Sequence, residues 1–370
     1  MLNTLPLNQL EELRNVAPYY YDWLSHRPED PWWDWAELRN KYGRAKAAVL
    51  NLSAWYDDNY GPEGATTNFN GLISSRSNDQ EKRTHLLLGP WVHGGTAQAK
   101  SGEREFGPFA IIDYDDVVLR WMDYYLRGVD NGVEKEKPVR YLVMGDHTWR
   151  ESDRWPPPAT PVPYYLHAPA AGRNRGAISL EKPSERRVTS FVSDPSKPVL
   201  NPYDSSGAHD YRQLAERSDV RVFDSPPMER DLEVTGPILV KMFVSCECRD
   251  LDLWVRLLDL APDGTAFNLM SPGLDVQRAS YRDLSKGRQL LRPGTIYEIG
   301  PVSLMTSNVF QKGHSIRVQI SGSFFPNFSR NLQNGELEND SADLTKATIT
   351  VYLDPDHPSH IVLPVVPRTQ

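Results

Sequence analysis

Two side chains that could share a proton, Asp57 and His93, each follow a predicted strand. The strands are the apolar runs at residues 46–54 and 83–89, whose composition is typical of strands covered on both faces. The residues between them, GPEGATTNFNGLISS, favour a short helix, and a strand–helix–strand crossover makes the two strands parallel. If the strands are neighbours, the two side chains leave the same edge of a sheet, about 5 Å apart.

An aspartate beside a histidine is the base half of a nucleophilic triad. The carboxylate holds the imidazole in one tautomer and stabilises the imidazolium that forms when the ring accepts a proton. The order, Asp57 before His93, is that of α/β-hydrolases. Each residue also has an ordinary interpretation, Asp57 as a turn or helix-cap acid and His93 as a loop histidine. Their matching positions after consecutive strands favour the pair over either residue alone.

The other candidate residues favour structural roles. Asp58 is expected to be a cap or a solvated neighbour, and His85 falls inside a strand, where a packed imidazole is the default. His357 and His360 could suggest a metal, but Pro358 between them and the lack of a third ligand argue against it. We therefore expect no metal and no cofactor.

The amino-acid composition and the periodicity of apolar residues change along the chain. Residues 1–36 carry aromatic clusters and helical stretches without a strand signal. Residues 113–128 have helical periodicity, with Asp113 as N-cap and Gly128 at the left-handed exit, so the region with the two strands is predicted to be α/β. Beyond residue 156 come short alternating runs separated by Gly, Pro, Asn and Asp, the spacing of an antiparallel sandwich.

Composition excludes several classes of partner. The 370 residues carry a net charge of -8, which argues against binding to nucleic acid or to an anionic membrane. No run approaches the ~18 apolar residues of a membrane span, and the first residues do not resemble a signal peptide, so a cytoplasmic location is the default expectation. Cys246 and Cys248 point to one face of a strand and are predicted to be packing residues, not a disulfide or a metal site.

Several motifs in order resemble the cocaine esterase and X-Pro dipeptidyl-peptidase family of α/β-hydrolase serine hydrolases, the CocE/NonD type. They are AWYDDNYG, LLLGPWVHGG, FGPFAIIDYDDVVLRWMDYYLRGVDNG and PVRYLVMGDHTWRESDRWPP, followed by DVRVFDSPPMERDLEVTGPI and ISGSFFPNFSRN. The resemblance implies that Asp57 and His93 are triad members. It also implies α/β plus all-β architecture: a helical-cap remnant at 1–36, the C-terminal part of an α/β-hydrolase core at 37–132, and a jelly-roll β-sandwich at 133–370.

The sequence departs from this family where the nucleophile should be. The serine should precede Asp57 on a glycine-flanked elbow, but Ser25 and Ser53 lack flanking glycines and no Gly-x-Ser-x-Gly exists. We therefore expect the C-terminal portion of a longer hydrolase, inactive by itself. Acids that bind a substrate ammonium in the family's α-amino-acid ester hydrolases are replaced by Asn59 and Tyr60, which counts against amino-acid esters.

Two functional hypotheses follow. The first is a serine hydrolase of ester or amide bonds, acting on a small molecule or a short peptide, with Trp55 and Trp91 either lining an acyl pocket or packing in the core. The second is a non-catalytic jelly-roll binding or structural module, or an inactive truncated fragment. In either case the partial sheet leaves an apolar edge, through which the chain could form a homo-oligomer.

Overall fold

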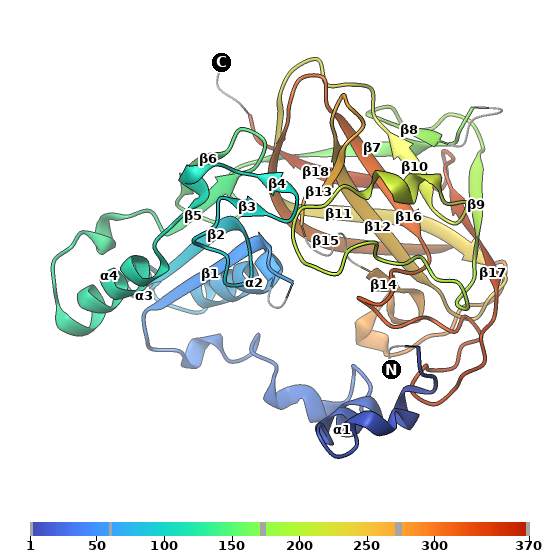
Figure 1. The fold of residues 1–370 in the computed structure, drawn as a ribbon, viewed down its shortest axis with the longest axis horizontal. Coiled ribbons are helices and arrows are strands. Elements are labelled where there is room, and N and C mark those ends of the chain that lie inside the picture. The colour runs from blue at the N-terminus through green and yellow to red at the C-terminus, as the bar shows by residue number, and fades with distance from the viewer. Residues whose placement is uncertain (1–2, 59–60, 171–174, 271–275, 368–370) are drawn as a thin grey trace.

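The computed structural model describes residues 3–58, 61–170, 175–270 and 276–367 and is a mixed α/β structure dominated by two sheets (Figure 1). The helices are α1 (Tyr19–Ser25), α2 (Gly61–Ser74), α3 (Asn78–Glu81) and α4 (Tyr114–Arg127). The first sheet has the order β1 (Val49–Tyr56), β2 (Thr84–Val92), β5 (Val139–Val143) and β6 (Thr148–Ser152). A separate hairpin is formed by β3 (Lys100–Ser101) and β4 (Arg104–Glu105).

The first sheet has the parallel pairing that the sequence predicts. β1 pairs with β2 in parallel, β2 pairs with β5 in parallel, and β6 closes the sheet antiparallel to β5. α2 and α3 cross from β1 to β2, and α4 lies on the crossover from β2 to β5. β5 and β6 follow the boundary expected after residue 132, and β5 pairs across it with β2.

Local sequence signals explain α4. The Asp113 carboxylate accepts a hydrogen bond from the Asp116 backbone N–H at 3.1 Å, and Gly128 ends the helix in the left-handed conformation with φ 70°. Glycine adopts this conformation without steric cost, so both predicted caps are confirmed.

The second sheet contains twelve strands, almost all antiparallel. Its main path runs β13-β12-β16-β10-β8-β7-β18-β11-β17-β9, with β14 on β12 and β15 on β11; β10 and β8 pair in parallel. The bounds are β7 (Thr160–His167), β8 (Arg175–Ser179), β9 (Val188–Ser193), β10 (Arg221–Asp224), β11 (Leu232–Cys246), β12 (Asp252–Leu260), β13 (Ala266–Asn268), β14 (Val276–Arg278), β15 (Tyr297–Phe310), β16 (Ser315–Ser321), β17 (Ala347–Tyr352) and β18 (His360–Val365).

One apolar core spans both sheets. It includes Trp55 and Leu86 of the first sheet together with Val234 and Ile299 of the second. The N-terminal segment, residues 3–36, is held to the strand-rich region and runs beneath it in Figure 1. Its backbone donates from Leu7 N to the Glu338 carbonyl oxygen at 2.9 Å, which is one of several such contacts with residues 338–340. No described helix is long and apolar enough to cross a membrane.

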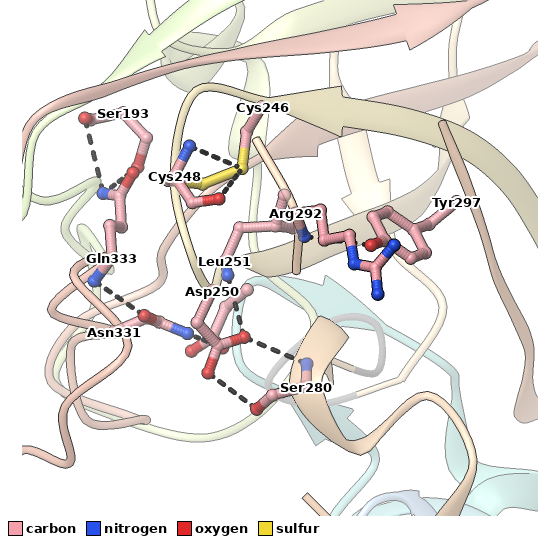
Figure 2. The surroundings of a disulfide bond; sticks show 11 residues. Ser193, Cys246, Cys248, Asp250, Leu251, Ser280, Arg292, Tyr297, Asn331 and Gln333 are labelled. Carbon is pink, nitrogen blue, oxygen red and sulfur yellow. Dashed lines mark hydrogen bonds between the residues drawn. A yellow bond between two sulfur atoms is a disulfide. The ribbon is translucent and has the colours of Figure 1, made fainter. Parts of the chain in front are cut away.

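Cys246 and Cys248 form a disulfide, which corrects the prediction that they are unpaired packing residues (Figure 2). Both side chains are buried, as predicted. The prediction failed because it assumed an extended strand, in which residues two apart are about 6.6 Å from each other. Here β11 ends at Cys246 and the chain bends, so the two Cα atoms lie 5.2 Å apart, well inside the range that a disulfide needs.

The disulfide closes a very short loop, so its effect on stability should be small. For a loop of three residues, the chain-entropy model gives about 1–2 kcal/mol. We therefore predict that the variant Cys246→Ala/Cys248→Ala loses about 1–2 kcal/mol in free energy of unfolding, measured by urea denaturation. Reductant should lower the wild type to the variant's value and leave the variant, which has no cysteine, unchanged. A wild type whose stability does not respond to reductant would contradict the disulfide.

Candidate active site

The register of β1 and β2 sets which residues leave the sheet together. From Val49 to Ala54 each residue pairs with one that is 35 positions later, but Tyr56 pairs with Val92, which is 36 positions later. One extra residue in β2 therefore creates a bulge just before the end of the strand. Asp57 and His93 follow this last pair, so both start from the same level of the sheet. Without the bulge, Asp57 would be level with Val92. The side chain of His93, one residue further along, would then point to the opposite face of the sheet.

The sequence Gly89–Pro90–Trp91 accounts for the bulge. Proline has no N–H for the strand ladder and is tolerated at bulges. The Trp91 indole folds back over Gly89, where an added Cβ would lie 2.2 Å from the ring. Only glycine at position 89 leaves room for this ring. The three residues together therefore favour the bulge that precedes His93.

Asp57 and His93 are in contact at the carboxyl edge of the sheet. The His93 Nδ1 atom lies 3.3 Å from Asp57 Oδ1 and 3.4 Å from Oδ2. The Asp57 side chain is 9% exposed, whereas the His93 side chain is 56% exposed. Because Nδ1 faces the carboxylate, Nε2 lies on the opposite side of the ring. The backbone turns at Asp57 from β1 into α2, with Gly61 N donating to the Asp57 carbonyl oxygen at 2.9 Å.

The distance between the His93 ring and the Asp57 carboxylate does not by itself distinguish this pair from other contacts between a histidine and an aspartate. Three further histidines in the described part of the chain contact an aspartate: His26 with Asp30, His314 with Asp259 and His357 with Asp354. The His357 pair matches most closely, at 3.3 Å with side chains 35% and 9% exposed, but its members are three residues apart in a local turn. The pair at Asp57 is the one that joins the carboxyl ends of two neighbouring parallel strands, the edge where open α/β sheets bind ligands.

Trp55 and Trp91 are core residues in this structure. Trp55 is 0% exposed and its indole N–H donates to the Leu142 carbonyl oxygen at 2.8 Å. Trp91 is 1% exposed and donates to the Ala110 carbonyl oxygen at 2.7 Å. Both N–H groups are satisfied by backbone acceptors and both rings are enclosed by packed side chains. The structure therefore favours the packing role over the acyl pocket that was the other interpretation.

The remaining candidates have structural environments. His85 is buried against the Trp121 ring, and burial lowers the pKa of its imidazole. The Ser25 hydroxyl donates to the Asp22 carbonyl oxygen within α1, and Ser53 is buried in the middle of β1. Neither serine is at a strand-to-helix turn. Asn59 and Tyr60 lie outside the described residues, and no group of metal-ligating side chains occurs among the residues that are described.

A buried charged cluster joins the β3–β4 hairpin to the second sheet. Asp259 of β12 lies 2.8 Å from His314 Nδ1 and 4.0 Å from the Arg104 guanidinium of the hairpin. Asn308 donates to the same carboxylate at 3.4 Å. The hydrogen bond that the His314 ring donates to the Asp259 carboxylate raises the pKa of His314. Asn308 and His314 lie 49 and 55 positions from Asp259, and no local pattern in the sequence indicates that they meet.

Solved structures of hydrolases share this fold. An aminopeptidase from the marine sediment archaeon Thaumarchaeota archaeon matches with a TM-score of 0.83 at 22% identity, over 97% of this chain and 62% of that one. An α-amino acid ester hydrolase matches with a TM-score of 0.82 at 24% identity, over 96% and 61%. At such identities the similarity shows the fold alone, a mixed α/β and strand-rich architecture used by hydrolases.

Sequence comparisons identify the family. The model of the X-Pro dipeptidyl-peptidase C-terminal non-catalytic domain matches residues 131–362, more than half of the chain, and the model of X-Pro dipeptidyl-peptidase (S15 family) matches residues 3–95. The chain is 29% identical over 380 residues to the cocaine esterase of Rhodococcus sp. (strain MB1 Bresler), covering 98% of this chain and 64% of that protein. The chain belongs to the cocaine esterase and X-Pro dipeptidyl-peptidase family of hydrolases. It spans less than two thirds of the length of these relatives.

The contact between His314 and Asp259 should make stability depend on pH. The folded-state pKa of His314 is raised, so its contribution is fully present below the unfolded pKa of about 6.5 and is lost as pH rises through the folded value. We predict a coupling free energy between the two side chains of about 1–3 kcal/mol near pH 5.5 that decreases markedly near pH 8.5. A double-mutant cycle with His314→Gln and Asp259→Asn, followed by urea denaturation at both pH values, measures it. An equal coupling at both values would contradict the prediction.

Proposed function

We propose that the chain is the part of a serine hydrolase that supplies the base and its orienting carboxylate, with Asp57 as the orienter and His93 as the general base. The observation that carries this proposal is the 3.3 Å contact at the carboxyl ends of two neighbouring parallel strands. The family supports a hydrolase of esters or peptides. The nucleophilic serine and the oxyanion donors are proposed to come from polypeptide outside residues 1–370.

The geometry assigns a role to each ring nitrogen. Nδ1 of His93 holds its proton toward Asp57, and the lone pair of Nε2 receives the proton of a serine hydroxyl as its oxygen attacks the substrate carbonyl carbon. Asp57 stabilises the resulting imidazolium. The imidazolium then returns the proton to the departing alcohol or amine, which leaves an acyl-enzyme. Water then gives a proton to Nε2 as its oxygen bonds to the acyl carbon. The bond from that carbon to the serine oxygen breaks and releases the acid, and the serine oxygen takes the proton back from Nε2.

The open edge of the first sheet is consistent with a contribution from further polypeptide. β1 is the terminal strand of this sheet, with β2 as its one partner in the described order. An edge strand offers unpaired N–H and C=O groups to a further strand. We propose that strands carrying the nucleophile pair with this edge, since that would bring them beside the end of β1 from which Asp57 projects.

We propose a domain organisation that broadly follows the two sheets. We propose that residues 1–36 are the end of a helical cap and that the second sheet is a jelly-roll sandwich. The hydrolase core is proposed to extend from residue 37 to residue 132 and the sandwich from residue 133, which is close to residue 131, where the match to the C-terminal-domain model begins. The substrate is proposed to be a small-molecule ester or amide, or a short peptide.

A second candidate function is a non-catalytic binding or structural module. The description of the family model that matches residues 131–362 as a non-catalytic domain favours it for that part of the chain. Under this alternative the contact between Asp57 and His93 has no chemical role, and no extended form of the chain depends on either side chain for hydrolysis.

The decisive experiment compares residues 1–370 with the polypeptide obtained by extending the reading frame upstream. We expect the extended polypeptide to contain a Gly-x-Ser-x-x-Gly elbow, to react with a fluorophosphonate probe, and to hydrolyse a p-nitrophenyl ester or an Xaa-Pro p-nitroanilide. Residues 1–370 alone should not be labelled. In the extended form, His93→Ala and Asp57→Asn should each lower kcat/KM by about 10⁴-fold.

The His357 pair provides the matched control. His357→Ala removes an imidazole that has the same aspartate distance, 3.3 Å, in a local turn. It should leave kcat/KM within about twofold of the wild type. Stable labelling of a serine within residues 1–370, or equal losses from His93→Ala and His357→Ala, would refute the proposal.

A further inference from the structure

The β9–β10 connection of the second sheet reaches the edge where Asp57 lies. Within it, the Ser206 hydroxyl donates to the carboxylate of Asp58, the residue after Asp57. This contact joins side chains that are 148 positions apart. Asp58 is exposed, as expected of a solvated neighbour, and it also accepts this hydroxyl from the β9–β10 connection.

Asn268 binds Tyr56, the residue that precedes Asp57. It is fully buried at the end of β13, and its carbonyl oxygen accepts a hydrogen bond at 2.9 Å from the hydroxyl of Tyr56, the residue before Asp57. Burial raises the pKa of Tyr56 to about 12, so the phenol keeps the proton that it donates.

The side chain of Asn268 holds the β9–β10 connection at the same time. Its amide nitrogen donates to the Gly207 carbonyl oxygen at 3.0 Å and to the Met270 carbonyl oxygen at 2.6 Å. Its amide oxygen accepts from the His209 backbone N–H at 2.7 Å. A buried amide with both its donor and its acceptor group satisfied is a rigid junction. The residue that binds Tyr56 thus also fixes the segment that carries Ser206.

The β9–β10 connection also packs against the β3–β4 hairpin, which follows His93 in the chain. Gly102 forms a parallel bridge with Ala208, and Glu103 N donates to the Ala208 carbonyl oxygen at 2.7 Å. The backbones touch here: a Cβ on Gly102 would lie 2.4 Å from the Ala208 carbonyl oxygen, and one on Gly207 would lie 2.5 Å from Gly102 N. Ser101, next to this contact, donates its hydroxyl to the carbonyl oxygen of Pro90 in β2.

We propose that Asn268 and Ser206 are positioning residues, which hold Asp57 against His93 by fixing the residues on either side of Asp57. The proposal rests on the role assigned above to the Asp57–His93 pair and extends it to the second sheet. Tyr56 and Asp58 flank Asp57, and each is bound by a group from the strand-rich region. The region that the family model describes as non-catalytic therefore sets the geometry of the carboxylate that orients the base.

Physically, two bonds restrain one short turn. The chain leaves β1 at Tyr56 and turns into α2, and a turn of this kind has rotational freedom that a single buried tyrosine does not remove. The two bonds restrain the side chains of the residues on either side of Asp57. When both are lost, the carboxylate samples orientations that no longer face Nδ1 of His93, and the Nδ1–H tautomer loses its partner.

The test is the tautomer of His93, which can be read without any hydrolytic activity. Ring ¹⁵N shifts of histidine-labelled protein distinguish Nδ1–H from Nε2–H, and His93→Gln assigns the signal. We expect the neutral wild-type ring to be mainly Nδ1–H. In Tyr56→Phe/Ser206→Ala, which deletes the two hydroxyls and keeps the ring packing, the Nε2–H fraction should rise by at least about threefold. Asp57→Asn should give a change in the same direction.

Two matched variants control for the loss of a hydroxyl. Tyr125→Phe removes a tyrosine hydroxyl that donates to the Lys82 carbonyl oxygen on the α4 side of the sheet, and Ser205→Ala removes the serine beside Ser206. Both should leave the tautomer balance at the wild-type value. An unchanged balance in a folded Tyr56→Phe/Ser206→Ala protein would overturn the proposal.

If the double variant does not fold, Ser206→Ala alone decides the question, because Ser206 is only partly buried. A shift in the same direction supports the proposal and no shift refutes it. Failure of the hydrolase assignment is seen separately, as absent probe labelling of the extended polypeptide, and does not alter the tautomer readout.

Discussion

The parallel pairing of β1 with β2, shifted by one residue at its end, is the constraint on which the site depends. Side chains of a strand alternate between faces, so a shift of one residue decides whether two side chains meet or point apart. The shift lies between Ala54 and Tyr56, opposite Gly89–Pro90–Trp91. The Trp91 ring occupies the space above Gly89, and its N–H is bound by the Ala110 backbone. Trp91, for which the sequence left both an acyl pocket and core packing open, thus packs at the bulge that precedes His93.

Much of the first sheet follows from local sequence patterns. The apolar runs before Asp57 and His93, the crossover helix between them and the caps of α4 can all be derived from residue spacing, because each depends on neighbours within one helix or strand. The juxtaposition of Asp57 and His93 follows from the parallel crossover. The bulge that brings them level could not be predicted, because it arises from the packing of one indole ring against one glycine.

Features formed by distant residues or by a local bend were missed. Asn268 and Ser206 lie about 200 and 150 positions from the residues they bind, and neither belongs to a motif. The disulfide was missed because the sequence does not show that the chain bends directly after Cys246. The pairing of β5 with β2 joins strands that lie on opposite sides of residue 132 in the chain, and no local sequence pattern indicates it.

Two backbone bridges tie the strand-rich region to the part of the chain that carries Asp57 and His93. Met144, directly after β5, bridges to Asn308 of β15, and Gly102 of the β3–β4 hairpin bridges to Ala208 of the β9–β10 connection. Separating the two parts would break these main-chain hydrogen bonds, so the bridges resist a hinge motion between them. The edge that carries Asp57 and His93 therefore lies beside a junction held by backbone hydrogen bonds as well as by the shared apolar core.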